Sequence, residues 1–125
     1  MGEHRKELRK KFLAFTPVYD SQQKILLGFV GDLTLSGVMV VGERAVESGI
    51  ERLLKIEFPT DLPQLTASPI FIHARTAWCR QDVETPRSYH IGFEFIELDP
   101  EHSKLIQAIL GRYRFRDNYP APAED

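Results

Sequence analysis

The stretch Ser68–Arg80, SPIFIHARTAWCR, decides the fold class of this chain. Its residues divide into two faces at every second position. The first face holds Ile70, Ile72, Ala74, Thr76 and Trp78, and the second holds Phe71, His73, Arg75, Ala77 and Cys79. Division of this kind, with a period of two, is the pattern of a β-strand. The stretch therefore predicts a long strand with two distinct faces.

Five further segments have the character of strands. They are KKFLAFTPVYD (10–20), KILLGFVGDL (24–33), SGVMVVG (36–42), RLLKIEF (52–58) and SYHIGFEFIEL (88–98). Branched and aromatic residues fill these segments, and turn-forming residues such as Asp20, Ser21 and Pro59 bound them. Gly28 and Gly31 lie inside a segment, where glycine predicts a bend, a bulge or a close backbone approach.

The periodicity changes to that of a helix after residue 98. Asp99 suits the N-cap position, and Pro100 suits the first helical position. The apolar stripe expected on this helix consists of Leu105, Ile106, Ile109, Leu110 and Tyr113. The sequence leaves two possibilities for the C-terminal end of this helix. Gly111 can terminate it, or it can continue through RYRFR (112–116).

Six strands followed by one helix predict a mostly β fold. Short connections between consecutive strands favour antiparallel pairing. Closure into a barrel removes the exposed edges that a small open sheet would leave. The expected fold is a six-stranded antiparallel β-barrel with a C-terminal α-helix over an open end or a seam. A two-sheet sandwich is the second architecture.

Composition narrows the class of protein. The 125 residues suffice for one domain, and the net charge is −2 with 42% hydrophobic and 27% charged residues. The single cysteine, Cys79, excludes a disulfide within the chain and a zinc site built from several cysteines. No run approaches the about 20 apolar residues of a membrane span. We expect a cytoplasmic protein with no membrane insertion.

Catalytic patterns are absent from the sequence. The four histidines, His4, His73, His90 and His102, are scattered and have no metal-ligand spacing such as HExxH. There is no GxSxG nucleophile motif and no GxxxxGK[ST] phosphate loop. For Cys79, a packed strand residue is favoured over a nucleophile. We therefore expect no enzyme activity, no cofactor and no metal site.

Charge is concentrated at the two ends of the chain. Residues 4–11 carry Arg5, Lys6, Arg9, Lys10 and Lys11 against one acid, Glu7, whereas the last six residues read PAPAED. The expected organisation is a flexible basic arm over 1–11, a barrel with its helix over 12–116, and a disordered tail over 117–125. The arm contains an R-x-x-x-R pair, which by itself is common in basic segments.

A second short motif lies between two of the expected strands. The segment GDLTLSG places Asp32, Thr34 and Gly37 in the order D-x-T-x-x-G. Such residues form many ordinary turns, because Asp, Ser and Thr side chains bond nearby backbone amides. This motif is also weak when it is taken alone.

The motifs become specific in combination. Their arrangement in the chain resembles that of the PilZ domain family. The motifs that carry the resemblance are R-x-x-x-R before the first strand, D-x-T-x-x-G, and the pair AWCR (77–80) and IGFEF (91–95). Members of that family bind the bacterial second messenger cyclic di-GMP, and the resemblance covers about residues 4–113. The family motif has serine where this chain has Thr34, which keeps the hydroxyl group. The resemblance also implies a six-stranded antiparallel barrel with a C-terminal helix.

Roles for individual residues follow from the resemblance. Arg5 and Arg9 would use their planar guanidinium groups on phosphate oxygens or on the O6/N7 edge of guanine. Asp32 would accept the N1–H and N2–H donors of guanine, and Thr34 would bond a remaining base atom. Gly37 would let the ligand approach the backbone.

Two more residues are candidates for the rim of this site. Trp78 and Arg80 are placed where they would pack on or stack with a base. For Trp78, packing in the core is an equal alternative.

The sequence thus predicts a cyclic di-GMP receptor that signals through a separate, unidentified protein when ligand orders its arm. A PilZ-like adaptor that does not bind the nucleotide is the first alternative. A small barrel that binds single-stranded nucleic acid is the second, but the acidic net charge opposes it, and no DNA or RNA partner is expected.

Overall fold

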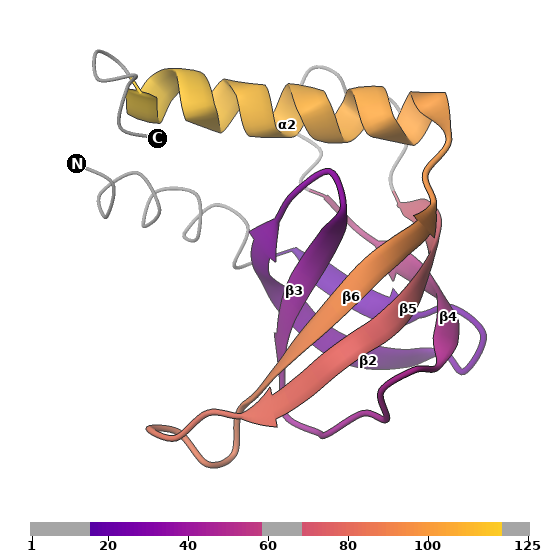
Figure 1. Ribbon diagram of the computed structural model, residues 1–125, viewed down its shortest axis with the longest axis vertical. Helices are drawn as coiled ribbons and strands as arrows, with labels where there is room; N and C mark the ends of the chain where they lie inside the picture. The colour runs from indigo at the N-terminus through magenta and orange to yellow at the C-terminus, as the bar shows by residue number, and fades with distance from the viewer. Residues whose placement is uncertain (1–15, 59–68, 119–125) are drawn as a thin grey trace.

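A computed structural model describes residues 16–58 and 69–118 of the chain, with side chains of the C-terminal helix up to Gly111. Its elements are β1 (Pro17–Asp20), β2 (Ile25–Leu33), β3 (Gly37–Gly42), β4 (Glu51–Ile56), β5 (Ile70–Gln81), β6 (Tyr89–Glu97) and α2 (Pro100–Asn118) (Figure 1). The arm with Arg5 and Arg9, the start of the first expected strand and the tail from residue 119 lie outside the described residues.

The six strands form a closed barrel in the order β1-β2-β3-β6-β5-β4. Every neighbouring pair is antiparallel, and β1 completes the circle by pairing with both β2 and β4. Closure gives every strand a partner on each side, which removes the exposed edges of a small open sheet. The predicted barrel is confirmed, and the sandwich is not the architecture.

Alternating apolar residues of the strands fill the barrel interior. The side chains of Ile72, Ala74 and Val40 are at most 1% exposed. The remaining strand residues of this core include Val18, Val30, Leu33, Val38, Leu54, Ile56, Ile70, Ile91 and Phe93. Each large aliphatic side chain buried in this way contributes about 1.5–3 kcal/mol to folding. Of the two faces of β5 that the sequence separated, the one with Ile70, Ile72, Ala74 and Thr76 is buried.

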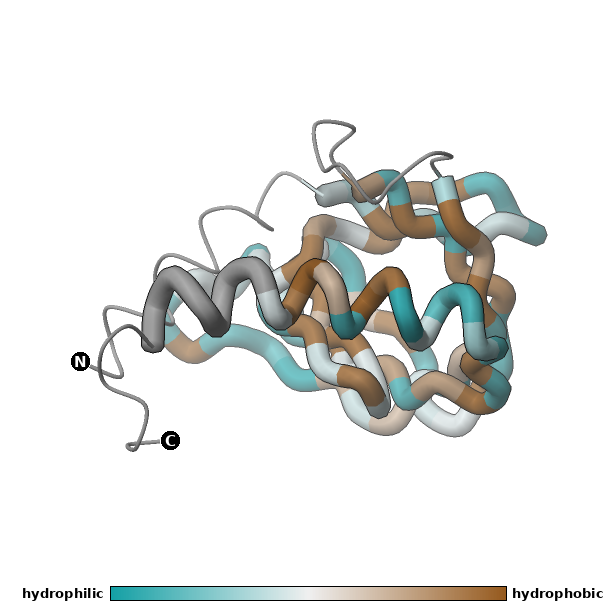
Figure 2. The backbone as a smooth tube through the Cα atoms, turned by 90° about the horizontal axis from the view of Figure 1, so that it is seen from above, coloured by the Kyte–Doolittle hydropathy of each residue, from teal (hydrophilic) through white to brown (hydrophobic). Residues whose placement is uncertain are grey.

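Helix α2 lies across one end of the barrel (Figures 1 and 2). It begins as predicted, because the backbone N–H of His102 donates to Oδ1 of Asp99 at 2.8 Å. Ile106, Ile109 and Leu110 are buried against the core, which closes that end. Gly111 does not end the helix, which continues to Asn118. Within the described residues, no helix combines the length and apolar character needed to cross a membrane.

Strand β2 is irregular at both of the glycines that the sequence singled out. The register with β3 shifts between Val30 and Asp32, so Gly31 is the extra residue of a β-bulge. Gly28 has a φ of 151°, and a Cβ there would collide with the carbonyl oxygen of Val41. The prediction of a bulge and of a close backbone approach is confirmed.

Strand β5 contains a bulge that the sequence did not predict. Its register with β6 shifts between Thr76 and Trp78, so Ala77 is the extra residue. A bulge reverses the order of inward and outward side chains beyond it. The prediction that Trp78 shares a face with Ile70–Thr76 is therefore wrong: the Trp78 side chain is 39% exposed, and Cys79 packs against the core instead.

A buried ion pair lies where β1 meets β4. Asp20 caps the turn after β1, as expected, by accepting the N–H groups of Gln22 and Gln23 at 3.0 Å. Its other oxygen accepts a bond of 2.9 Å from Nη1 of Arg52, and Nε of Arg52 donates to the hydroxyl of Thr76 at 3.2 Å. The side chains of Asp20 and Arg52 are 3% and 10% exposed. The pair connects three strands inside the barrel.

Candidate functional site

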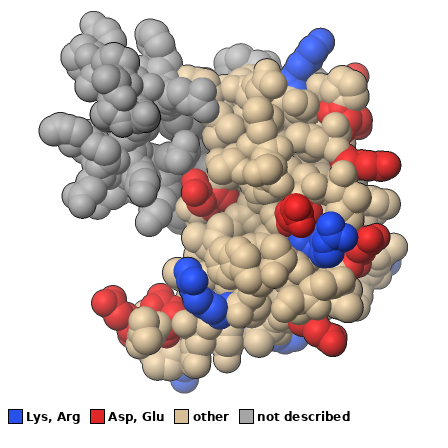
Figure 3. Space-filling model, in the orientation of Figure 1, with Lys and Arg blue, Asp and Glu red and all other residues tan. Residues whose placement is uncertain are grey.

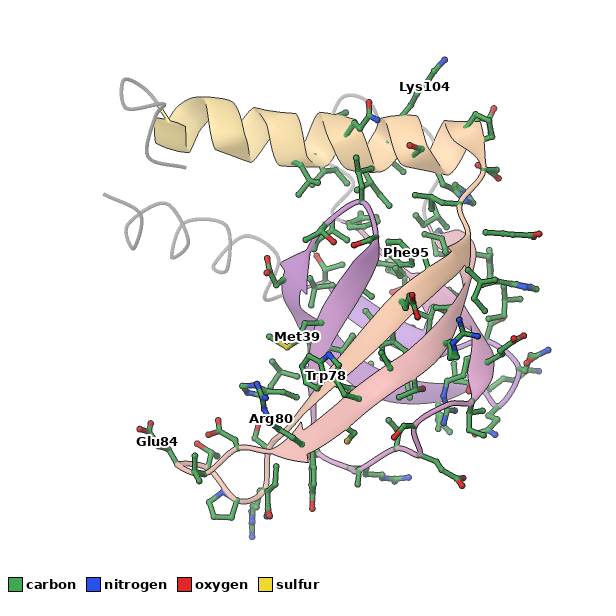
Figure 4. All side chains as sticks on the ribbon, in the orientation of Figure 1. Met39, Trp78, Arg80, Glu84, Phe95 and Lys104 are labelled. Carbon is green, nitrogen blue, oxygen red and sulfur yellow. The ribbon has the colours of Figure 1, made fainter. Side chains whose placement is uncertain are left out.

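Four residues form one row across the outer face of the barrel. The register aligns Asp32 with Met39, Met39 with Gly92, and Gly92 with Trp78, and so crosses β2, β3, β6 and β5. The row spans three strand-to-strand steps of about 4.8 Å each. Figure 4 shows Met39 and Trp78 on the same face of the barrel, over β3, β6 and β5.

The two bulges are the reason that the ends of this row face outward. Regular alternation from the buried Val30 would direct Asp32 inward, but the extra residue Gly31 turns it outward. The extra residue Ala77 does the same for Trp78 on the other side. Bulges next to functional sites often redirect a side chain in this way. A carboxylate and an indole are thereby presented on one surface.

A hollow of about 420 Å³ lies over the row. Its lining includes four residues that the sequence predicted for the site, Asp32, Thr34, Gly37 and Trp78, together with Glu94. Arg80 is not among the described residues that line it. The structure thus brings together the D-x-T-x-x-G motif and the tryptophan of AWCR, which are more than forty positions apart in the chain.

Asp32 and Thr34 are held by local hydrogen bonds. Oδ1 of Asp32 accepts the N–H of Leu33 at 2.9 Å. The hydroxyl oxygen of Thr34 accepts the N–H groups of Ser36 and Gly37 at 3.2 Å, and the N–H of Thr34 donates to the carbonyl of Gly37 at 2.9 Å. Thr34 therefore shapes the turn between β2 and β3, in addition to the predicted contact with a base.

Gly37 is required by the pairing of β3 with β6. A Cβ at this position would collide with the carbonyl oxygen of Phe93 on β6. Since that oxygen belongs to the backbone of β6, which is paired on both sides, the strand would have to move to accept any side chain. The predicted role of Gly37 in ligand approach stays a prediction, and the barrel itself gives a second reason for glycine.

Gly37→Ala should therefore destabilise the barrel in the absence of any ligand. We expect the free energy of unfolding to fall by about 1–3 kcal/mol, the usual cost of overpacking. Urea unfolding followed by circular dichroism measures this change. Gly111→Ala is the comparison, because a Cβ at Gly111 meets nothing within 4 Å and alanine within helix α2 should raise the free energy of unfolding by about 1 kcal/mol. A Gly37→Ala protein with the wild-type unfolding midpoint would contradict the packing role.

Trp78 forms one wall of the hollow. The guanidinium of Arg80 lies 5.0 Å from the centroid of the Trp78 ring, at cation–π distance, and Figure 4 shows the two side chains next to each other. An aromatic ring on the rim of a hollow offers a surface on which a nucleotide base can stack. The exposed position of Trp78 on the hollow excludes the alternative that it packs in the core, and its contact with a base stays a prediction.

Glu94 lines the hollow and was missed by the sequence analysis. Its carboxylate lies 3.6 Å from Nη2 of Arg75, whose Nη1 lies 3.8 Å from a carboxylate oxygen of Glu51. These three side chains are between 42% and 68% exposed, so the ion pairs contribute little to stability. No local pattern marks Glu94, because its place opposite Gly37 depends on the pairing of β3 with β6.

Other features of the described residues lie apart from this site. A larger hollow of about 830 Å³ is lined by Leu26, Phe29, Arg44 and Arg87 among others, and by none of the residues predicted for the site. Among the side chains that the structure describes, in residues 16–58 and 69–111, no group of three or more His, Cys, Asp or Glu could hold a metal ion. On the face shown in Figure 3, acidic and basic side chains are interspersed.

Comparisons with known proteins give a consistent result. The family model described as PilZ domain matches residues 3–112. No curated protein matches the chain. The PilZ domain of YcgR from Escherichia coli with c-di-GMP is similar in structure, with a TM-score of 0.61 and 13% identity over 86% of this chain and 87% of that one.

A second similar structure is the Bacillus subtilis inhibitor of motility, MotI/DgrA. Its TM-score is also 0.61, with 15% identity over 86% of this chain and 47% of that chain. The present chain thus corresponds to about half of that protein. Likeness at this level of identity concerns the fold.

Proposed function

Because this chain belongs to the PilZ domain family, whose model matches residues 3–112, we propose that it is a receptor for cyclic di-GMP. The proposal assigns binding and signalling to the protein, without catalysis, cofactor or metal. The observation that carries it is the outward row of the barrel, which puts Asp32 and Trp78 on the same hollow as the Thr34 turn. The similar YcgR domain was solved with c-di-GMP.

The chemistry of the hollow suits a guanine base. The Watson–Crick edge of guanine presents two N–H donors, and the carboxylate of Asp32 can accept both at charge-assisted strength. The indole of Trp78 offers a stacking surface for the base. The phosphates and the O6/N7 edge then require cations, and Arg5 and Arg9 have the fork geometry for both.

Signalling follows from the placement of the two motifs in the chain. Arg5 and Arg9 precede the first strand, whereas Asp32 lies on the barrel. A ligand that bonds to both would dock the arm on the barrel and form a surface that does not exist without it. We infer that a separate protein recognises this surface.

Titration of the full chain with cyclic di-GMP in a calorimeter tests this function. We expect saturable binding, and at least about 100-fold weaker binding of cyclic di-AMP, because adenine lacks the paired N1–H and N2–H donors. An absence of heat with cyclic di-GMP would favour the adaptor that does not bind nucleotide.

The arm lysines provide a control within the same experiment. Replacing Lys6, Lys10 and Lys11 together by alanine should slow association and change the dissociation constant much less than Arg9→Ala does, because these lysines contribute mainly long-range attraction. Equal losses for the lysine and arginine variants would show that the arm acts only as a cationic tail.

A further inference from the structure

The indole of Trp78 occupies the space above Gly92 on the neighbouring strand. A Cβ built on Gly92 would lie less than 3.0 Å from three ring atoms, Nε1, Cε2 and Cζ2 of Trp78. These three atoms form one continuous edge of the indole. The three atoms nearest to that Cβ all belong to the ring. The edge of the ring therefore occupies the volume that a side chain at position 92 would take.

The register explains why these two residues compete for one place. Trp78 lies directly opposite Gly92, and Gly92 lies directly opposite Met39 on the next strand. Directly opposite residues have Cβ atoms about 4.5–5.5 Å apart, so side chains on one face of neighbouring strands contact each other. With glycine in the middle of the row, the ring can extend over β6 toward β3, where it borders the hollow.

Arg80 restrains the same ring from within β5. Its guanidinium lies 5.0 Å from the ring centroid, and it stands two positions after Trp78, on the same face of the strand. The ring is thus placed by the absence of a side chain at Gly92 and by a cation at Arg80. Of the two, Gly92 has the larger effect on position, because a Cβ there is sterically incompatible with the observed ring.

We propose that Gly92 is a positioning residue, which sets the place of the Trp78 indole and thereby the stacking wall for a guanine base. This inference rests on the proposed function and deepens it. Gly92 also lines the hollow, but in this role it acts through the ring and not through a contact of its own with the ligand. Its effect on binding would act entirely through Trp78.

A thermodynamic cycle separates this role from simple damage to the barrel. The proteins are wild type, Gly92→Ala, Trp78→Ala and the double variant, each titrated calorimetrically with cyclic di-GMP. We expect Gly92→Ala to weaken binding about tenfold, within the range that loss of one aromatic–base stack produces. In the Trp78→Ala background the same change should cost less than about twofold, because the ring that the Cβ would meet is absent.

Fluorescence gives a second readout that needs no ligand. Trp78 is the single tryptophan of the chain, so the emission reports this ring alone. In Gly92→Ala we expect emission at longer wavelength and stronger quenching by acrylamide, because the displaced ring is more exposed to water. Gly111→Ala, which meets no neighbour within 4 Å, should leave both the emission and the dissociation constant unchanged.

The possible outcomes are distinct. If Gly92→Ala does not fold, the double variant decides: recovered folding supports the inference, because removal of the ring leaves room for the Cβ, and continued failure overturns it. Equal losses of affinity from Gly92→Ala with and without Trp78, or unchanged emission and quenching, also overturn it. Wild-type protein that does not bind cyclic di-GMP overturns the proposed function, and this inference with it.

Discussion

Asp32→Ala is expected to abolish measurable binding of cyclic di-GMP while the protein stays folded. The carboxylate would accept two N–H donors of guanine, and hydrogen bonds to a charged group are worth about 1.5–3 kcal/mol each. Loss of both predicts about 100-fold or greater weakening. In the folded protein Oδ1 of Asp32 accepts the N–H of Leu33 at 2.9 Å, and loss of a hydrogen bond of this kind costs about 1 kcal/mol, so we expect the variant to remain folded.

Calorimetric titration and thermal melting measure the two halves of this prediction. Arg9→Ala should lose binding in the same way, since a guanidinium that bonds a phosphate or a guanine edge has no substitute in alanine. Undiminished titration heats for either variant would contradict the assignment.

Glu94→Gln is the matched control for Asp32. It removes a negative charge from the same hollow, and Glu94 is exposed and paired only at 3.6 Å with Arg75 among the contacts described. If binding depended only on the electrostatic field, loss of either carboxylate would strengthen the binding of an anionic ligand. We expect Glu94→Gln to leave binding unchanged or slightly stronger, so that a loss confined to Asp32 identifies hydrogen bonding as the cause.

Arg52→Met is expected to be the most destabilising substitution of a charged residue in the barrel. It would leave the carboxylate of Asp20 buried without the 2.9 Å bond from Nη1 of Arg52. Removal of one partner of a buried ion pair costs about 3–5 kcal/mol, because the remaining charge is no longer compensated. Urea unfolding of the ligand-free protein should show this loss as a lower midpoint at an unchanged slope.

Arg75 of β5 provides the comparison. Arg75→Met removes contacts of 3.6 and 3.8 Å to two glutamates, and the Arg75 side chain is 42% exposed, so we expect a change of at most about 1 kcal/mol. The double variant Asp20→Asn with Arg52→Met should recover part of the stability that Arg52→Met loses. Similar costs for Arg52→Met and Arg75→Met would show that burial of the pair is unimportant.

Local patterns in the sequence were sufficient for the main elements. Alternation predicted the long strand β5 and separated its two faces as far as Thr76, and Asp99 with Pro100 predicted the start of the helix. Both signals depend on residues within a few positions of each other. The end of the helix was not predictable from Gly111, because glycine within a helix costs only about 1 kcal/mol and neighbouring turns can compensate for it.

Features that depend on strand pairing were not predictable from the sequence. The ion pair of Asp20 and Arg52 joins residues 32 positions apart. The bulge at Ala77 has no local marker, since alanine fits a regular strand equally well, and the outward face of Trp78 was therefore missed. The sequence indicated an irregularity at Gly31, but it did not show that the bulge turns the side chain of Asp32 outward.

By itself, the sequence determined the strands, the start of the helix and the motif residues of the candidate site, because periodicity, capping and residue chemistry are local properties. Only the tertiary structure decided that Asp32 and Trp78 share one surface and that Gly92 makes room for the indole. The alignment of Asp32, Gly92 and Trp78 in one row depends on the registers of three strand pairs and on two bulges. A shift of one residue in any register would turn one end of the row into the core.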